Sequence, residues 1–361
     1  MVGMRDVAKE AGVSLSTVSL VVNKTGYVSD DMRARVKAAM KELNYVPNEL
    51  ARNLYKNRTN LVGVIVPTIR HPFFATLTAH LQRELAAQGL RTMLCSTADA
   101  ENGEVEYVDM LRRHMMDGII VCSHTTHPND YWTSIHRPIV AFDRVLGGGI
   151  ASIGSDHEQG GRLMAHMLVN TGAHHVVMIG GPRDQFFDLA ARNGDSPDDF
   201  DLHKTTFPTV RYYLALEQEL KAAGVRYEYV EAGNVEDFQG YKNAVNAVLN
   251  RMPVDGVDAV VSSDISAALC VREAMRRHIS IPRDLQIIAY DGTYLTDLAG
   301  MKMTAVAQNF DKIAQVAVGN IVRAIAKEGD AKADTTSATG RKPYEPDVLI
   351  PVTLKLGDTT R

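Results

Sequence analysis

The sequence is poor in the features that mark secreted and membrane proteins. It has three cysteines in 361 residues, Cys95, Cys122 and Cys270, and each lies within or beside an apolar run. An odd number at wide spacing argues for reduced core thiols and against a disulfide framework. No apolar run approaches the ~18 residues that span a bilayer. Residues 1–12 carry charges and no apolar signal core. We therefore expect a cytoplasmic protein without a membrane span.

The chain also lacks a large net charge, but its charges are unevenly distributed. The net charge is −4, and the composition, 45% hydrophobic and 23% charged, is ordinary for a globular protein. Residues 1–60 hold ten Lys and Arg against six Asp and Glu, whereas the remaining residues hold 29 against 37. A small basic head on an acidic body suggests that only the head has a polyanionic partner. The length allows two or three domains.

The first forty-odd residues predict three helices. The first covers Met4–Ala11, and Gly12 suits the left-handed position that ends it. Ser14 can cap a second helix, and Ser29, which precedes two aspartates, can cap a third. Two short helices joined by a tight turn and braced by a third form a helix-turn-helix unit.

The second of these helices, in "GVSLSTVSLVVN" (12–23), has two unlike faces. Its valines form one stripe, which is enough to dock the helix on a core. The opposite stripe holds Leu15, Ser16, Ser19 and Leu20, with no charge. In a helix-turn-helix unit this face enters the major groove, where hydroxyls can reach phosphates or bases and leucines can pack on thymine methyl groups. Alternatively, the leucines close the head's own core or touch a neighbouring domain.

The segment "RDVAKEAGVSLSTVSLVVNKTGYVSDDMRARVKAAMKELNYVPNELARNL" resembles the head of the LacI/GalR repressors over about fifty residues. The resemblance covers "DVA..AGVS..TVS.V.N", "VS..MR..V..A...LNY.PN" and the "A..L" of the family's hinge. The family most often has a polar residue, commonly Arg, at the position of Leu20. The resemblance implies binding to double-stranded operator DNA. We assign DNA contact to Arg5, Ser14, Leu15, Ser16, Thr17, Ser19, Leu20, Asn23, Ser29, Tyr45, Asn48, Arg52 and Leu54.

The segment after the head predicts a short hinge. Pro47 ends the third helix and Asn48 can cap a new one, but 49–55 is too short to be stable alone. The resemblance implies a hinge helix that orders on operator DNA and wedges Leu54 between base steps of the minor groove. The alternative is a plain linker. We expect a DNA-binding domain at 1–46, a hinge and linker at 47–60, and an effector-binding and dimerisation domain at 61–361.

From Leu61 onward, apolar runs of strand length alternate with amphipathic helical stretches. The runs include "LVGVIVP", "LRTMLCS", "DGIIVCS", "PIVAFD", "HHVVMIGG", "YEYVEA", "DAVVSS" and "LQIIAYD". This alternation predicts parallel sheets covered on both faces, with strands enough for two. The resemblance implies an α/β body of two lobes, like periplasmic binding proteins, below an all-α head. Its ligand would lie in the cleft between the lobes.

Polar and aromatic residues follow these strands, where ligands of open α/β sheets bind. Acids that accept from hydroxyls and rings that cover a C–H face suit a sugar, and the resemblance matches each position to the cleft. Asp264 has a simpler alternative as the cap of the next helix. We assign effector contact to Arg70, Phe73, Phe74, Asp143, Ser263, Asp264, Tyr290, Asp291, Gln308 and Phe310, and to one of Arg192 and Arg211.

The choice between those two arginines stays open because the region after "MIGGPRD" departs from the family pattern. In the family, a ligand-binding arginine follows the Gly-Pro turn soon. Here an insertion rich in aspartate and aromatic residues lies within 183–210. A loop of this length in a compact domain is usually functional or disordered, and beside a cleft it could form a lid over a larger ligand.

Two motifs predict less than they suggest. Cys122, His124 and His127 lie close together, but no second Cys/His pair completes a metal site, and "GGG" at 147–149 lacks the context of a phosphate loop. We expect no metal, no cofactor and no catalytic residue. The prediction is a homodimeric repressor controlled by a small sugar. We expect a dimer and not a tetramer because the leucine-rich helix of tetrameric relatives does not follow "DVLIPVTLKLGDTTR". The alternatives are control by a nucleobase or other metabolite, a solute-binding protein, and a sugar-processing enzyme.

Overall fold

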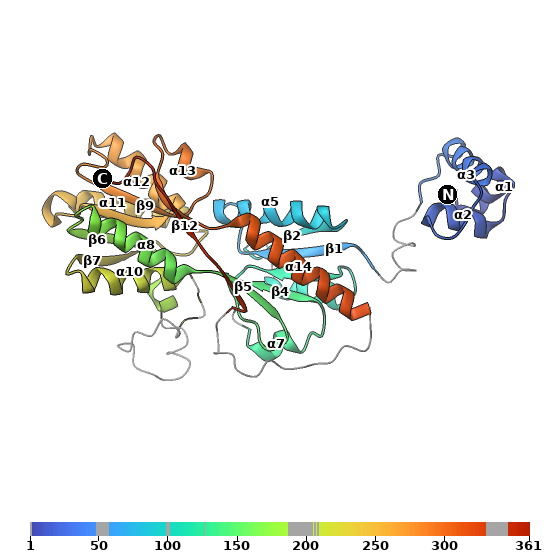
Figure 1. The fold of residues 1–361 in the computed structure, drawn as a ribbon, viewed down its shortest axis with the longest axis horizontal. Helices are drawn as coiled ribbons and strands as arrows, with labels where there is room; N and C mark the ends of the chain where they lie inside the picture. Colours follow the sequence, from blue (N-terminus) through green and yellow to red (C-terminus); the bar gives the residue numbers. More distant parts are fainter. Residues whose placement is uncertain are drawn as a thin grey trace. The chain divides into compact units, whose positions relative to one another are not determined.

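The protein consists of two compact units, Met1–Asn60 and Leu61–Arg361 (Figure 1). The computed structural model describes residues 2–47, 58–98, 102–125, 127–186, 205, 207, 209–329 and 346–361. The expected hinge helix, with Asn48, Arg52 and Leu54, lies outside the described residues. Within the described part, no helix is both long and apolar enough to cross a membrane.

The head contains the three predicted helices, α1 (Met4–Ala11), α2 (Leu15–Asn23) and α3 (Asp30–Glu42). Gly12 takes the left-handed conformation at the end of α1, with φ of 59°. Arg35 of α3 donates hydrogen bonds to the carbonyl oxygens of Ala11 and Gly12, which fixes the turn against the third helix. Small apolar side chains fill the core: Val7, Ala8, Ala11, Val18, Val21, Val28, Val36 and Ala39.

The first lobe of the body is built on a sheet with strand order β11-β5-β4-β3-β1-β2. All its pairs are parallel. One face packs on α5 and α14 and the other lies over α6 and α7, so the inner strands β1, β3, β4 and β5 are buried on both sides. The strands are β1 (Leu61–Val66), β2 (Arg91–Ser96), β3 (Gly118–Val121), β4 (Ile139–Phe142), β5 (Ala151–Ser155) and β11 (Val348–Ile350), and the helices α5 (Pro72–Ala87), α6 (Glu104–Arg112), α7 (Asn129–Thr133) and α14 (Phe310–Gly329).

The second lobe repeats this plan with strand order β12-β10-β9-β8-β6-β7, in which only the β10–β12 pair is antiparallel. α8 and α10 cover one face, and α11 and α12 cover the other. The strands are β6 (His175–Gly180), β7 (Arg226–Glu231), β8 (Ala259–Ser263), β9 (Gln286–Asp291), β10 (Thr304–Ala307) and β12 (Thr353–Lys355). The helices are α8 (His157–Asn170), η1 (Arg183–Phe186), α10 (Val210–Ala222), α11 (Phe238–Asp255), α12 (Asp264–Arg276) and α13 (Leu295–Leu298).

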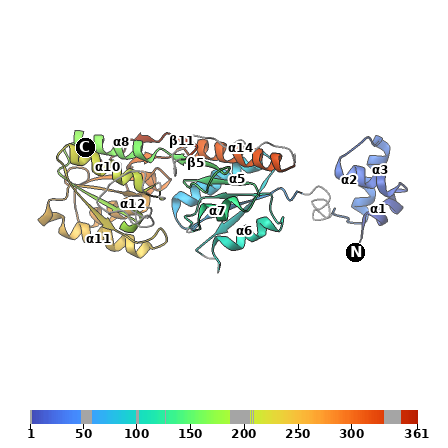
Figure 2. The ribbon, with the colours of Figure 1, turned by 90° about the horizontal axis from the view of Figure 1, so that it is seen from below.

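The described part of the chain passes between the lobes three times: from β5 to α8, from β10 to α14, and from β11 to β12. Hydrogen bonds join the first and third crossings, from Asp156 N to Ile350 O (2.8 Å) and from Val352 N to Gln159 Oε1 (3.0 Å). In Figure 2, β5, α8 and β11 run along one side of the body, while α6 and α11 lie along the other. The first and third crossings therefore lie together on the side of β5, α8 and β11, where they form a hinge.

The predicted fold class, a helical head with a two-lobed α/β body, is confirmed. Each apolar run quoted above forms a strand, and the three cysteines are buried and free. Four strands do not correspond to any of the quoted runs: β5, β10, β11 and β12. The last two have three residues each and lie at sheet edges, and β5 contains two serines and a glycine. These strands are too short, or have too few apolar residues, for their sequence pattern to be distinguished from that of a loop.

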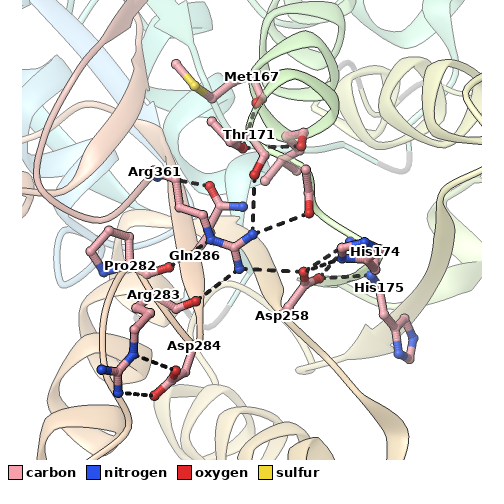
Figure 3. A network of polar contacts seen from close by, with 12 residues as sticks. Met167, Thr171, His174, His175, Asp258, Pro282, Arg283, Asp284, Gln286 and Arg361 are labelled. Atoms are coloured by element: carbon pink, nitrogen blue, oxygen red, sulfur yellow. Dashed lines mark hydrogen bonds and ion pairs between the residues drawn. The ribbon is translucent and has the colours of Figure 1, made fainter.

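Arg361 fastens the outer end of the second lobe (Figure 3). Its guanidinium lies 3.7 Å from the carboxylate of Asp258, which itself accepts from the backbone N–H groups of His174 and His175. The Arg361 backbone N–H donates to Gln286 Oε1 at 3.1 Å. The guanidinium also donates to four carbonyl oxygens, those of Thr171, Gly172, Pro282 and Arg283. One side chain thereby joins three loops at the ends of strands.

We predict that Arg361→Ala lowers the free energy of unfolding by ~1–3 kcal/mol. The loss stays in this range because the guanidinium is about one-third exposed, and solvent screens its bonds. Urea denaturation of both proteins measures the change. Arg283→Ala is the control, since that side chain is exposed and pairs with its neighbour Asp284. Equal stability of the Arg361 and Arg283 variants would show that the network is not stabilising.

Candidate functional site

The helix-turn-helix presents α2 as the sequence predicts. Ser14 caps the helix by accepting a hydrogen bond from Thr17 N at 3.1 Å, and Val18 and Val21 are buried in the head core. The Ser14 hydroxyl also lies within hydrogen-bond distance of the Ser16 and Thr17 hydroxyls, at 2.7 and 2.9 Å. These three hydroxyls are held together at the start of the helix, which is the end that approaches bases in this motif.

The two leucines of the outward face differ. Leu15 is 44% exposed. Leu20 is partly buried and packs against the head core, and it lies so close to Gly26 that a Cβ there would be 3.1 Å from its Cδ2. The structural alternative for Leu20 therefore has support in these contacts, whereas Leu15 is free to contact a base edge.

The other predicted DNA-contact residues of the head occupy varied positions. Arg5 is exposed on α1, and the Ser19 hydroxyl accepts from Asn23 Nδ2 at 3.1 Å. Ser29 caps α3, with Met32 N donating to its hydroxyl. Tyr45 packs against the head core. Tyr27, which the prediction omitted, is 91% exposed in the loop between α2 and α3.

The body contains a cavity of about 340 Å³ between the two lobes. Its walls come mainly from the carboxyl ends of the parallel strands, including β3, β4, β8 and β9 and the residue after β10. Of the predicted effector residues, seven line the cavity: Phe73, Phe74, Asp143, Ser263, Tyr290, Asp291 and Gln308.

Asp291 occupies the floor of this cavity at the end of β9. Its backbone φ is 122°, which lies in a region that residues other than glycine rarely adopt. Its Oδ1 accepts a hydrogen bond from Gln308 Nε2 at 2.8 Å, and Gln308 Oε1 accepts from the Ser155 hydroxyl at 2.6 Å. Among the described residues Gln308 is the hydrogen-bond partner of this carboxyl group, which leaves Oδ2 able to accept from a ligand.

Asp143 follows β4 in the first lobe, and both oxygens of its carboxylate have hydrogen-bond partners. Oδ1 accepts from Ser155 N at 3.1 Å, and Oδ2 lies 3.0 Å from His157 Nε2. The other ring nitrogen of His157, Nδ1, lies 2.7 Å from the Tyr290 hydroxyl. Tyr290 directly precedes Asp291, so the hydrogen bonds form a closed path across both lobes. We call it the hinge ring: Asp143, Ser155, His157, Tyr290, Asp291 and Gln308.

Aromatic rings form much of the remaining wall. Tyr290 stacks on Tyr212 with ring centroids 3.9 Å apart and planes 9° apart. Tyr213 lies beside Tyr212 and donates to the carbonyl oxygen of Ile179. A Cβ on Gly180 would come within 2.4 Å of the hydroxyls of Tyr213 and Tyr229. Tyr212 and Tyr213 were not predicted because "RYYLALE" has the pattern of an ordinary amphipathic helix, and Tyr229 was not predicted because it lies within the strand run "YEYVEA".

Two hydroxyls that line the cavity are buried and have no hydrogen-bond partner among the described residues: Ser123 Oγ and Ser263 Oγ. Ser123 belongs to the loop after β3 in the first lobe, and Ser263 ends β8 in the second. A buried hydroxyl without a partner loses free energy, so each is suited to a ligand's hydroxyl. Ser123 was not predicted, although it follows an apolar strand just as Asp143 does.

The structure does not bring four of the predicted effector residues to the cavity wall. Asp264 is buried behind it and accepts from Gly292 N, Thr293 N and the Thr293 hydroxyl, so it holds the turn after β9. It does not cap α12, whose N-cap is Ser263. Phe310 packs behind Phe73. The other two are Arg70 and Arg211, and Arg192 lies outside the described residues.

Contacts between the lobes also surround the cavity. The Arg70 guanidinium of the first lobe lies over the Phe238 ring of the second, 5.5 Å from its centroid. His124 stacks on Phe207, with centroids 3.7 Å apart, and both rings line the cavity. Phe207 belongs to the insertion, which therefore supplies part of the wall. His127, close to His124 in sequence, instead stacks on Tyr131.

The buried acids beneath the cavity have altered pKa values. Burial raises the pKa of Asp264 to about 6. Burial and then the nearby charge of Asp264 raise the pKa of Asp291 well above its usual value, against the hydrogen bond from Gln308. The folded protein therefore binds these protons more tightly than the unfolded chain does.

We predict that the stability of the wild type relative to Asp264→Asn increases by ~1–3 kcal/mol as the pH falls from 7 to 4.5. A raised folded-state pKa contributes stability that is full below the unfolded pKa and is lost as the pH rises through about 6. Urea denaturation at several pH values measures it. Asp237→Asn, at the cap of α11, is the control. A difference between wild type and Asp264→Asn that does not change with pH would contradict the prediction.

The head and body both match known families. Residues 3–48 match bacterial regulatory proteins of the lacI family. Residues 59–194 match periplasmic binding proteins and sugar binding domains of the LacI family, and residues 165–360 match the periplasmic binding protein-like domain.

Relatives of this chain extend over nearly its whole length. The sucrose operon repressor of Streptococcus mutans is 32% identical over 99% of this chain and 98% of that protein. The ribose operon repressor of Bacillus subtilis is 33% identical over 81% of this chain and 82% of its own. The fold matches that of the lac repressor dimer bound to operator, with a TM-score of 0.76, 20% identity and coverage of 99% and 98% of the two chains. This protein belongs to the LacI family of bacterial transcriptional regulators.

Proposed function

We propose that the protein is a homodimeric transcriptional repressor whose binding to operator DNA is controlled by a neutral sugar held between the lobes. The relatives described above are named as repressors of sucrose and ribose operons. One helix-turn-helix head reads half of a symmetric site, so two copies are needed for an operator. The ligand is bound and released without being converted, as expected of a regulator.

The composition of the cavity wall carries the sugar assignment. Asp291 offers a carboxylate oxygen, Ser123 and Ser263 offer hydroxyls from opposite lobes, and tyrosine and phenylalanine rings supply apolar faces. Sugars have a rim of hydroxyls and a C–H face, so they match both kinds of wall. A cavity of about 340 Å³ is at the small end of the range for ligand sites.

The charges of the described wall favour an uncharged sugar over a phosphorylated one. Three acids line the cavity, Asp143, Asp291 and Glu236. Arg144 also lines it, and its guanidinium donates to the carbonyl oxygens of Ser123 and Asp143. Burial lowers the pKa of His71 to about 4, so that side chain is neutral at pH 7. A phosphate would lie beside carboxylates with no opposing surplus of positive charge.

We predict that neutral mono- and disaccharides raise the melting temperature of the protein, and that sugar phosphates and nucleobases do not. A thermal-shift series with sucrose, D-ribose, their phosphorylated forms, adenine and hypoxanthine measures this. A tight ligand that stabilises only the folded state raises the melting temperature with concentration. If a nucleobase stabilised the protein, or if only the sugar phosphates did, the proposed ligand class, neutral sugars, would be wrong.

We predict that Asp291→Asn weakens binding of the stabilising sugar by ~1–3 kcal/mol, because an amide replaces the carboxyl group that would hydrogen-bond the sugar. Operator binding without sugar stays within about twofold. Calorimetry measures sugar affinity, and Asp311→Asn, at an exposed carboxylate of α14, is the control. Unchanged sugar affinity in Asp291→Asn would place the ligand elsewhere.

We predict that Leu15→Ala and Leu20→Ala have different effects in the head. Leu15→Ala weakens the binding of operator DNA by ~1 kcal/mol or more. It leaves unchanged both the melting temperature and the affinity for non-specific DNA, which is bound through its phosphates. Leu20→Ala lowers the melting temperature of the head, since the side chain packs on its core.

The test is a binding series on an operator obtained by in vitro selection, varied one base pair at a time, with thermal denaturation in parallel. Loss of discrimination at one base pair in Leu15→Ala assigns that leucine to a base. Equal loss on all sequences in Leu15→Ala, or a normal melting temperature in Leu20→Ala, would reverse the assignments. The Leu54 wedge remains a prediction of the sequence.

A further inference from the structure

His157 is buried at the hinge and contacts residues of both lobes. It is 2% exposed and begins α8, directly after the first crossing between the lobes. Its ring nitrogens reach Asp143 Oδ2 in the first lobe and the Tyr290 hydroxyl in the second, at 3.0 and 2.7 Å. His157 is not among the residues that line the cavity. Any effect it has on a ligand must therefore pass through the two residues it holds.

The chemistry of the two partners fixes the direction of the hydrogen bonds. An ionised carboxylate only accepts, so Nε2 of His157 carries the hydrogen that is donated to Asp143. With hydrogen on Nε2, Nδ1 can accept, and the Tyr290 hydroxyl donates to it. The Tyr290 hydroxyl is therefore oriented away from the cavity, and its ring is fixed flat against Tyr212, which lines the wall.

The space beneath α8 is shaped for this contact. A Cβ on Gly160, one turn after His157, would lie 2.7 Å from Tyr290 Cε2 and 2.9 Å from its hydroxyl. Only a glycine lets the tyrosine reach the histidine. The backbone of Asp143 is in the left-handed region, with φ of 50°, and the bonds from Ser155 and His157 hold it there.

The hinge ring connects this contact to the ligand-binding oxygen. From Tyr290 the path continues through the peptide to Asp291, whose Oδ1 is bound by Gln308, and Gln308 is bound by Ser155. A ligand that hydrogen-bonds Asp291 therefore contacts a residue that is linked to Asp143 of the other lobe by two routes. One route passes through Tyr290 and His157, and the other passes through Gln308 and Ser155. The path stays closed only while His157 links Asp143 and Tyr290.

We infer that His157 is a positioning residue for the effector site: it ties the Tyr290–Asp291 floor to the first lobe and makes binding of a sugar depend on the relative position of the lobes. This inference rests on the proposed function, because it concerns the same cavity. Asn in place of His157 retains an acceptor near Nδ1 and loses the donor to Asp143, whereas Gln retains the donor and loses the acceptor for Tyr290.

The test measures sucrose and D-ribose affinity by calorimetry in wild type, His157→Asn, His157→Gln, Tyr290→Phe and the double variant His157→Gln/Tyr290→Phe. We expect each single variant to bind ~10-fold more weakly. We also expect the double variant to be no weaker than Tyr290→Phe, because both changes break the same link. His166→Asn, on the exposed side of α8, is the control. Wild-type affinity in both His157 variants, or a ~100-fold loss in the double variant, would overturn the inference.

A second measurement does not depend on a sugar. The ¹⁵N chemical shifts of the His157 ring are expected to show hydrogen on Nε2 and an acceptor at Nδ1. In Tyr290→Phe the Nδ1 shift is expected to move, while the shifts of His166 stay constant. An unchanged Nδ1 shift, or hydrogen on Nδ1, would overturn the inference. If neither sugar binds the wild type, the proposed ligand class fails, and the ring shifts still decide whether His157 links Tyr290 to Asp143.

Discussion

The geometry of the effector cavity depends on the hinge ring, in which side chains from both lobes satisfy one another's hydrogen bonds. Asp143 and Asp291 both have positive φ, which costs free energy for residues other than glycine. Such conformations persist where surrounding contacts fix them, and here the bonds from Ser155, His157 and Gln308 do so. The ring lies beside the crossings between the lobes, so a change in the angle between them must alter its bonds. Occupancy of the cavity and the shape of the body are therefore linked through the same few atoms.

Much of this fold follows from the sequence, because period and composition determine it. Apolar runs such as "LVGVIVP" became buried parallel strands, and Gly12, Ser14 and Ser29 mark the helix ends where their chemistry requires them. The expectation that ligands bind beyond the carboxyl ends of parallel strands also identified seven residues that line one cavity. Short edge strands were not predictable, since three residues carry no period.

The partners of side chains were harder to predict than their positions. Asp264 stands at a strand end like Asp291, yet it turns toward the Gly292–Thr293 backbone, and sequence alone does not show which way a carboxylate points. His157 gave no signal in "SDHEQGG", because its role depends on Asp143 and Tyr290, which are distant in the chain. Leu20 likewise reads as an outward residue until its contact with the turn at Gly26 is known.

The most direct test of the coupling between cavity and hinge is the distance between the lobes with and without sugar. Spin labels can be attached at Glu106→Cys on α6 and Lys242→Cys on α11, which are both exposed positions, and the native cysteines are buried. The helices α6 and α11 lie along the side opposite β5, α8 and β11 (Figure 2). Pulsed electron paramagnetic resonance then gives the distribution of distances. We predict that the stabilising sugar shifts the distribution to shorter distances, and that His157→Gln reduces this shift at saturating sugar. A sugar that binds with full affinity while the distribution stays unchanged would contradict it.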